Sequence, residues 1–119
     1  RLDERFAGLQ YRFVYMACDS RPKETAGLFN AIARVDHLTG KTTMHELPIG
    51  CATNEPIFVP TNSDSKEGEG VLLANVFDGN RNSSYLLVLD AENLDSEPLA
   101  VAHLDHRVPF GFHGNWKPL

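Results

Sequence analysis

Short runs of apolar and β-branched residues, separated by glycine and polar residues, dominate the hydrophobic pattern of this chain. Runs of this kind, at spacings near ten residues, are typical of an all-β domain. No segment places apolar residues at helical spacing over several turns. The pattern therefore predicts about seven antiparallel strands, over residues 11–17, 29–36, 42–47, 52–59, 71–77, 84–89 and 99–104.

Turn residues indicate how some of these strands pair. Gly40 can supply the positive φ that a tight turn needs, so residues 29–36 and 42–47 are expected to form a hairpin. The apolar runs on either side of residues 78–82 are expected to be buried strands. Pro56 cannot donate to a sheet ladder, which places it at a strand start or on a sheet edge.

Two segments between the predicted strands lack strand character. Residues 61–70 are polar and acidic, and they predict a loop with no apolar anchor. Residues 21–26 predict a loop or a single helical turn.

Composition narrows the class of protein. The chain has 119 residues and 42% hydrophobic content, enough for at most one domain or for part of a larger one. It begins with Arg1 rather than methionine, which suggests a truncated or processed product. No apolar run approaches the ~18 residues that cross a bilayer, so no transmembrane segment is expected. A net charge of −5 without a basic stripe argues against a nucleic-acid partner.

The two cysteines bear on the compartment. Cys18 and Cys51 lie in separate segments and form neither a CxxC pair nor a disulfide framework. We expect both thiols to be buried, in a protein of a reducing compartment.

The most informative segment is the ending Pro-Phe-Gly-Phe-His-Gly-Asn-Trp, residues 109–116. It places His113 among glycines, which allow close backbone approach, and among Phe110, Phe112 and Trp116, which would exclude water. A neutral histidine in a dry site is a good ligand for a transition metal. The alternative is a buried structural histidine whose ring nitrogens bond to the backbone.

A second segment, Asn-Glu-Pro-Ile-Phe-Val-Pro at residues 54–60, sets one acid before an apolar run. Together with residues 110–116 it resembles the carotenoid cleavage oxygenase family, which includes lignostilbene dioxygenases and the retinal isomerase of the visual cycle. Residues 1–8 and 85–91 also resemble stretches of these enzymes, in the family's order. The resemblance covers nearly the whole chain but only the carboxyl-terminal quarter or so of such an enzyme. Thr61 differs, since the family often has arginine there.

The resemblance implies a fold. Family members have a seven-bladed β-propeller capped by loops, and a blade takes about 40–45 residues. Residues 1–119 would then form a sector of about two to three blades, the carboxyl-terminal part of the propeller domain.

The resemblance also implies a site. The family holds Fe(II) with four histidines from different blades, and His113 matches the last of them. Glu55 matches one of the glutamates that accept the other N–H of a ligand histidine, here that of His113 itself. The alternative for Glu55 is an edge-strand acid that faces solvent. Phe110 and Phe112 could line the substrate cavity or serve only in packing.

The implied protein is a non-haem Fe(II) dioxygenase that cleaves a carbon–carbon double bond of a carotenoid, apocarotenoid or stilbene with O2. Its partners would be a hydrophobic conjugated small molecule and the rest of the same polypeptide, without which this chain should be inactive. We expect a cytoplasmic or plastid-like location, with peripheral membrane contact only through regions outside this chain. The alternative function is that of a non-catalytic β-propeller or β-sandwich fragment, acting as a binding or structural module.

The other histidines carry weaker expectations. His103 and His106 lie in a strand followed by a turn, so they should not converge on a metal. His37 and His45 flank the Gly40 turn and are expected to face solvent. Asp105 and Arg107 are expected to form a surface ion pair or a turn contact.

Overall fold

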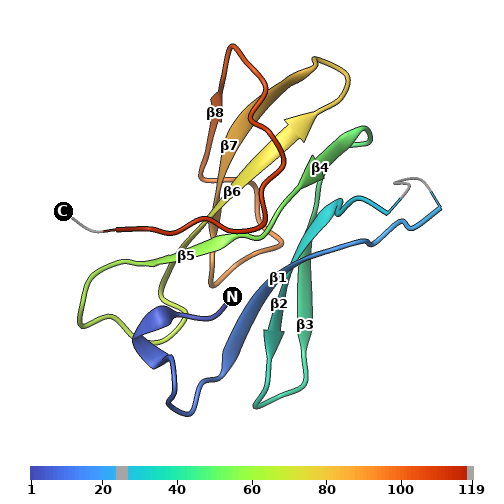
Figure 1. The fold of residues 1–119 in the computed structure, drawn as a ribbon. Coiled ribbons are helices and arrows are strands. Elements are labelled where there is room, and N and C mark those ends of the chain that lie inside the picture. The colour runs from blue at the N-terminus through green and yellow to red at the C-terminus, as the bar shows by residue number, and fades with distance from the viewer. Residues whose placement is uncertain (24–26, 118–119) are drawn as a thin grey trace.

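A computed structural model describes residues 1–23 and 27–117, and these residues form an antiparallel all-β structure (Figure 1). One short 3₁₀ helix, η1 (Glu4–Phe6), precedes the strands. The strands are β1 (Phe13–Cys18), β2 (Ala31–Asp36), β3 (Thr42–Glu46), β4 (Cys51–Thr53), β5 (Ile57–Pro60), β6 (Gly70–Asp78), β7 (Ser83–Asp90) and β8 (Ala100–His103). In the described ranges, no helix is long and apolar enough to cross a membrane.

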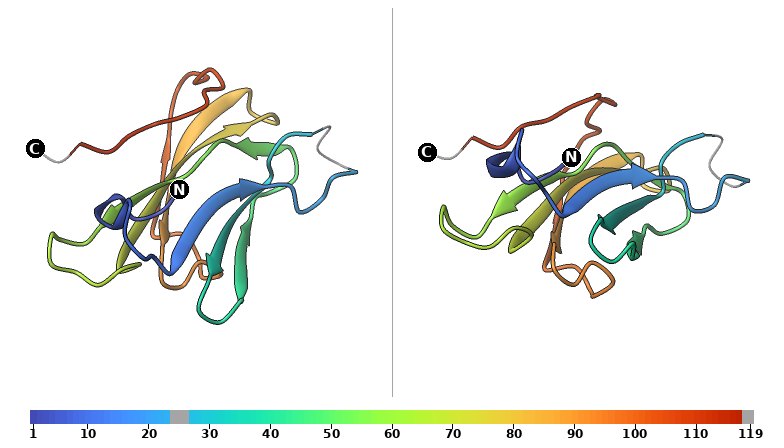
Figure 2. Two further views of the ribbon diagram at one scale, coloured as in Figure 1. Left: turned by 60° about the horizontal axis from the view of Figure 1, so that its bottom comes forward. Right: turned by 90° about the horizontal axis from the view of Figure 1, so that it is seen from below.

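The strands form two antiparallel sheets that share one core (Figure 2). The first sheet has the order β1-β2-β3, and the second has the order β4-β6-β7-β8. Strand β5 also pairs with β6, so β4 and β5 lie one after the other along the same side of that strand. Apart from this division, each sheet is a simple meander, in which strands that are close in sequence are neighbours in space.

The predicted hairpins are confirmed. Strands β2 and β3 pair across a turn in which Gly40 has a φ of 71°. Strands β6 and β7 pair over eight residues on each side, from Val71 opposite Asp90 to Asp78 opposite Ser83. In both hairpins the sequence pattern found the strands because apolar runs are separated by residues that suit tight turns.

The stretch predicted over residues 52–59, with Pro56 at a strand start or edge, forms two strands, and β5 begins directly after Pro56. Thr53 lies opposite Val76 and Ile57 lies opposite Leu73, so three residues, 54–56, face only two on β6. One extra residue on one strand is a β-bulge, which breaks the ladder and redirects side chains. Pro56 has no N–H to leave unpaired, which makes it suited to this break.

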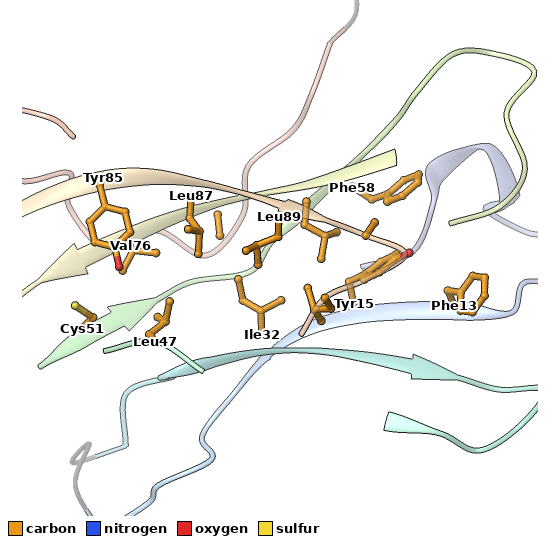
Figure 3. Close-up of a cluster of buried hydrophobic side chains, with 14 residues drawn as sticks. Phe13, Tyr15, Ile32, Leu47, Cys51, Phe58, Val76, Tyr85, Leu87 and Leu89 are labelled. Carbon is orange, nitrogen blue, oxygen red and sulfur yellow. The ribbon is translucent and has the colours of Figure 1, made fainter. Parts of the chain in front are cut away.

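The core lies between the two sheets (Figure 3). Tyr15 of β1 stacks on Phe58 of β5, with ring centroids 5.4 Å apart and planes 6° apart. Aromatic pairs of this kind add about 0.5–1.5 kcal/mol beyond their buried area. Ile32 from the first sheet and Leu89 from the second are also fully buried in this cluster. Each sheet therefore buries the apolar face of the other.

The loop over residues 61–70 is anchored, although the sequence offered no apolar anchor for it. The Arg5 guanidinium pairs with the buried Asp3 carboxylate at 2.6 Å and donates to backbone carbonyls of the loop, including those of Ser63 and Ser65. Glu67 Oε1 accepts the N–H groups of residues 12 and 13 at 2.7 and 2.9 Å. The anchors are charged and lie far away in sequence, so local hydropathy did not reveal them.

Two smaller expectations concern the cysteines and residues 21–26. Cys51 is buried, as expected, but Cys18 is only half-buried because it lies at the end of β1 beside the sulfur of Met44. Part of the segment predicted as a loop or helical turn over residues 21–26 lies outside the described residues.

Candidate metal centre

The segment that follows β8 begins at a buried anchor on β7. Ser84 is 1% exposed, and its carbonyl accepts the N–H of Leu104 at 2.9 Å while its own N–H donates to the carbonyl of His106 at 3.0 Å. The Ser84 hydroxyl oxygen accepts the N–H of Val108 at 3.0 Å. Ser84 thus forms hydrogen bonds with residues 104, 106 and 108, which lie just before the histidine motif.

The segment then crosses β6 and β5 on the face of the second sheet that points away from the core, here called the outer face (Figure 1). Phe110 contacts Phe77 of β6 edge to face, with ring centroids 6.0 Å apart. Gly114 lies against Ile57 of β5, where an added Cβ would come within 2.9 Å of the Ile57 Cδ1 atom. Gly111 has open space around it, so only the glycine after His113 serves the close approach predicted from the sequence.

The bulge between β4 and β5 directs Glu55 toward this segment. Thr53 of β4 is buried opposite core residue Val76, whereas Ile57 of β5 pairs with Leu73 and lies on the outer face. In an uninterrupted strand, residues 53 and 57 would share one face. The extra residue reverses the alternation, so Glu55 leaves the core side and reaches the outer face.

His113 and Glu55 meet across this face. The His113 Nδ1 atom lies 2.8 Å from Glu55 Oε2, although the two residues are 58 positions apart in sequence. An ionised carboxylate can only accept a hydrogen bond, so Nδ1 must carry the proton. In the neutral imidazole with this tautomer, the other ring nitrogen, Nε2, has the free lone pair that a metal ligand requires.

The electrostatic setting keeps Glu55 ionised. The hydrogen bond from His113, followed by the positive charge of Arg1, holds the pKa of the Glu55 carboxyl below its ordinary value. The Arg1 Nε atom lies 3.1 Å from the same oxygen, Oε2. The Glu55 side chain is 29% exposed, so it is neither free in solvent nor sealed in the core.

The aromatic enclosure that the sequence suggested is not formed by this chain. Phe112 is 91% exposed, Phe110 58% and Trp116 51%, and the His113 side chain is 73% exposed. Among the described residues, Phe110 is the one of these three rings with an aromatic partner, Phe77.

The remaining histidines lie elsewhere, in separate settings. His106 Nδ1 contacts its neighbour Asp105 at 2.6 Å, so Asp105 pairs with His106 and not with Arg107 as predicted. Arg107 instead lies over the ring of Phe77, 5.9 Å from its centroid. His103 contacts Arg81, and His37 packs edge-on against Tyr11. In the part of the chain that the structure describes, no three His, Cys, Asp or Glu side chains gather as a metal site.

Sequence reasoning missed three features of this site. The bulge was hidden because Pro56 alone cannot reveal the register of a partner strand. Ser84 carries no motif, and its role depends on contacts more than twenty residues away. Arg1 was noticed only as part of a stretch that resembles the family, and nothing local linked it to Glu55.

Comparison with known proteins places this chain in a family. The family described as retinal pigment epithelial membrane protein matches residues 1–118. A carotenoid cleavage oxygenase of Mycobacterium tuberculosis is 36% identical over 121 residues, which cover 99% of this chain and 24% of that protein.

Two solved structures agree with this assignment. A lignostilbene dioxygenase of Pseudomonas brassicacearum superposes with a TM-score of 0.90 at 28% identity, over 99% of this chain and 26% of that one. A cobalt-substituted apocarotenoid oxygenase of Synechocystis gives 0.86 at 30% identity, over 94% of this chain and 23% of that one.

The fold therefore matches part of enzymes that are named carotenoid cleavage, apocarotenoid or lignostilbene oxygenases. The chain belongs to the carotenoid cleavage oxygenase family. It spans about a quarter of the length of the relatives that it matches.

Proposed function

We propose that this chain is the carboxyl-terminal part of a non-haem Fe(II) dioxygenase that cleaves a carbon–carbon double bond of a carotenoid, apocarotenoid or stilbene with O2. The observation that carries the proposal is the hydrogen bond between His113 Nδ1 and Glu55 Oε2 at 2.8 Å. Family membership favours this oxygenase over a non-catalytic binding or structural module.

The residues present fit a metal of this kind. Ligand histidines usually donate their second N–H to a carboxylate or carbonyl, which fixes the tautomer and makes the ligand more basic. His113 has this arrangement with Glu55, and its side chain is 73% exposed. One imidazole cannot hold a metal alone, so the rest of the polypeptide would supply the other ligands. When bound, iron would supply the binding and activation of O2.

The sheet topology supports a propeller sector. The second sheet has four strand positions in meander order, with β4 and β5 sharing the first, and propeller blades are four-stranded sheets. The first sheet supplies three strands of a neighbouring blade. In this arrangement Glu55 lies on the first strand position of its blade, and we infer that this position faces the propeller axis.

The exposed aromatic rings have a role in this proposal. Phe112 is 91% exposed beside the proposed ligand, and Phe110 is 58% exposed. A large exposed apolar side chain beside a polar site is typical of a surface that another part of the protein or a ligand covers. We infer that other blades and the conjugated substrate cover these rings, which would then exclude water around His113.

The proposal is tested on the full-length protein that contains this chain. Metal analysis should find one iron per protein. Incubation with a carotenoid, an apocarotenoid and a stilbene under ¹⁸O₂ should yield two carbonyl products from one of the three. A protein that binds no iron and cleaves none of the three substrate classes would contradict the proposal.

A further inference from the structure

Arg1 contacts both sides of the His113–Glu55 pair. Its Nε atom lies 3.1 Å from Glu55 Oε2, the oxygen that also accepts the His113 hydrogen bond. Its Nη2 atom donates to the carbonyl of Gly114 at 2.9 Å and lies 3.3 Å from Asn115 Oδ1. The third nitrogen, Nη1, faces exposed Glu4 at 3.4 Å. Nη1 and Nη2 therefore donate hydrogen bonds, while Nε makes a close charge contact with Glu55 that lacks hydrogen-bond geometry, and the side chain is only 25% exposed.

These contacts connect segments that nothing in the sequence brings together. Glu55 lies in the bulge between β4 and β5, while Gly114 follows His113 in the segment that crosses the outer face. The planar guanidinium is rigid, so its charge contact with Glu55 and its hydrogen bond to the Gly114 carbonyl set the distance between these two groups. The flexible glutamate side chain would otherwise rotate, and an irregular backbone segment would otherwise shift.

We propose that Arg1 is a positioning residue for the metal ligand His113. It holds the carboxylate of Glu55 and the backbone beside His113 in one geometry, so that the imidazole Nε2 atom points in a fixed direction. This inference rests on the proposed metal role of His113.

The charge of Arg1 adds a second effect. Glu55 attracts the Nδ1 proton of His113, and a stronger attraction would make the imidazole more anionic. Arg1 shares the same carboxylate oxygen and offsets part of that attraction. The charge of Arg1 therefore moderates how strongly Glu55 draws the Nδ1 proton, which sets the ligand strength at Nε2.

The test uses the full-length protein and its Arg1→Gln variant, loaded with Co²⁺ in place of iron. Three quantities are measured: the Co²⁺ dissociation constant by chelator competition, the visible absorption of the bound Co²⁺, and the midpoint of thermal unfolding. Changes in the partner of a ligand typically cost about 10–100-fold in metal affinity. We expect Arg1→Gln to weaken Co²⁺ binding by about tenfold and to shift the absorption bands.

Arg5→Gln is the matched control. Arg5 is an equally engaged arginine near the amino end of the chain, but it binds Asp3 and the 61–70 loop instead of Glu55. Its loss should lower the unfolding midpoint and leave the Co²⁺ affinity and spectrum unchanged. Equal effects of both variants on the spectrum would show that Arg1 matters only for general stability, and this would overturn the inference.

A double variant checks that Arg1 acts through Glu55. If it does, Arg1→Gln combined with Glu55→Gln should weaken Co²⁺ binding by less than the product of the two single effects. Independent sites would instead combine to within about twofold of that product, and this result would overturn the inference.

Two further variants settle the remaining outcomes. If Arg1→Gln does not fold, Arg1→Lys tests the inference in its place: weaker Co²⁺ binding supports the inference, and wild-type affinity and spectrum overturn it.

His113→Ala separates this inference from the proposed function. Retention of Co²⁺ by His113→Ala would contradict the metal role itself, whereas loss of Co²⁺ there with wild-type behaviour of Arg1→Gln would contradict only the role of Arg1.

Discussion

Gly114 lies so close to Ile57 that a methyl group in place of its hydrogen would come within 2.9 Å of the Ile57 Cδ1 atom. This contact holds Gly114, the residue after His113, against Ile57 of β5. Ile57 lies two positions after Glu55 in the chain. The glycine in the Phe-His-Gly motif therefore has a packing role: it determines how near the imidazole comes to its carboxylate.

Gly114→Ala should lift the segment from the sheet and weaken the His113–Glu55 hydrogen bond. Because the Ile57 Cδ1 atom ends a flexible side chain and can move aside, we expect iron affinity in the full-length protein to fall by less than about tenfold, below the usual effect of changing a ligand's partner. Adding Ile57→Val removes the Cδ1 atom and should restore most of the loss. Gly111→Ala is the control, because the space around Gly111 is open. Failure of the double variant to recover would contradict this account of the motif.

His113→Ala in the full-length protein should remove most of the iron and abolish turnover, with little change in the unfolding midpoint. The physical reason is that the ring is 73% exposed and contributes little packing. His106→Ala is a matched control, since His106 also contacts a carboxylate, that of Asp105 at 2.6 Å. A structural role for His113 would give the opposite result: normal iron content and a lower midpoint.

Glu55→Gln should be milder than His113→Ala. Glutamine keeps the shape and an acceptor oxygen but loses the charge that makes the imidazole more basic, so metal affinity should fall about 10–100-fold. Iron titration of the full-length variant measures this change. Asp105→Asn, which alters the other His–carboxylate pair, should leave iron binding unchanged. Wild-type affinity in Glu55→Gln would show that the contact does not tune the ligand.

The Arg12–Asp36 pair should make stability depend on pH. Arg12 donates to both oxygens of Asp36, at 2.8 and 2.7 Å, and this holds the pKa of the Asp36 carboxyl well below its usual 3.8. A depressed pKa in the folded state stabilises the fold above the unfolded value and loses that effect as pH falls through the folded value.

The unfolding midpoint of Asp36→Asn should therefore lie below that of the wild type at pH 7. The gap should narrow below about pH 4, where the unfolded carboxyl becomes protonated. Thermal unfolding of both proteins across this pH range measures the gap. Asp95→Asn, at an exposed carboxylate, should show no such dependence, and a constant gap for Asp36→Asn would contradict the assignment.

Much of the fold could be predicted from the sequence, because its strands are short apolar runs bounded by turn residues. The hairpin at Gly40 and the β6–β7 pair are examples. The pairing of Glu55 with His113 was expected from the family resemblance, and the contact is present. The role of iron at this pair stays a proposal.

The parts that could not be predicted depend on distant contacts. The extra residue at 54–56 becomes visible only when the register with β6 is known. The contacts of Arg1 with Glu55 and Gly114 connect three segments of the chain, and no local sequence pattern predicts these contacts. Phe112 is 91% exposed in a chain that spans about a quarter of the length of the relatives it matches, and no local pattern predicts this exposure.

The bulge between β4 and β5 has a consequence for how this region can evolve. Because three residues face two, shortening or lengthening the stretch by one residue would exchange the two faces of β5 relative to β4. Phe58 would then turn out of the core, and Glu55 would no longer face His113. Folding and metal binding would therefore be lost together. The number of residues at 54–56 should therefore be constrained as well as the glutamate at position 55, and alignments of functional relatives should contain no insertions or deletions in this stretch.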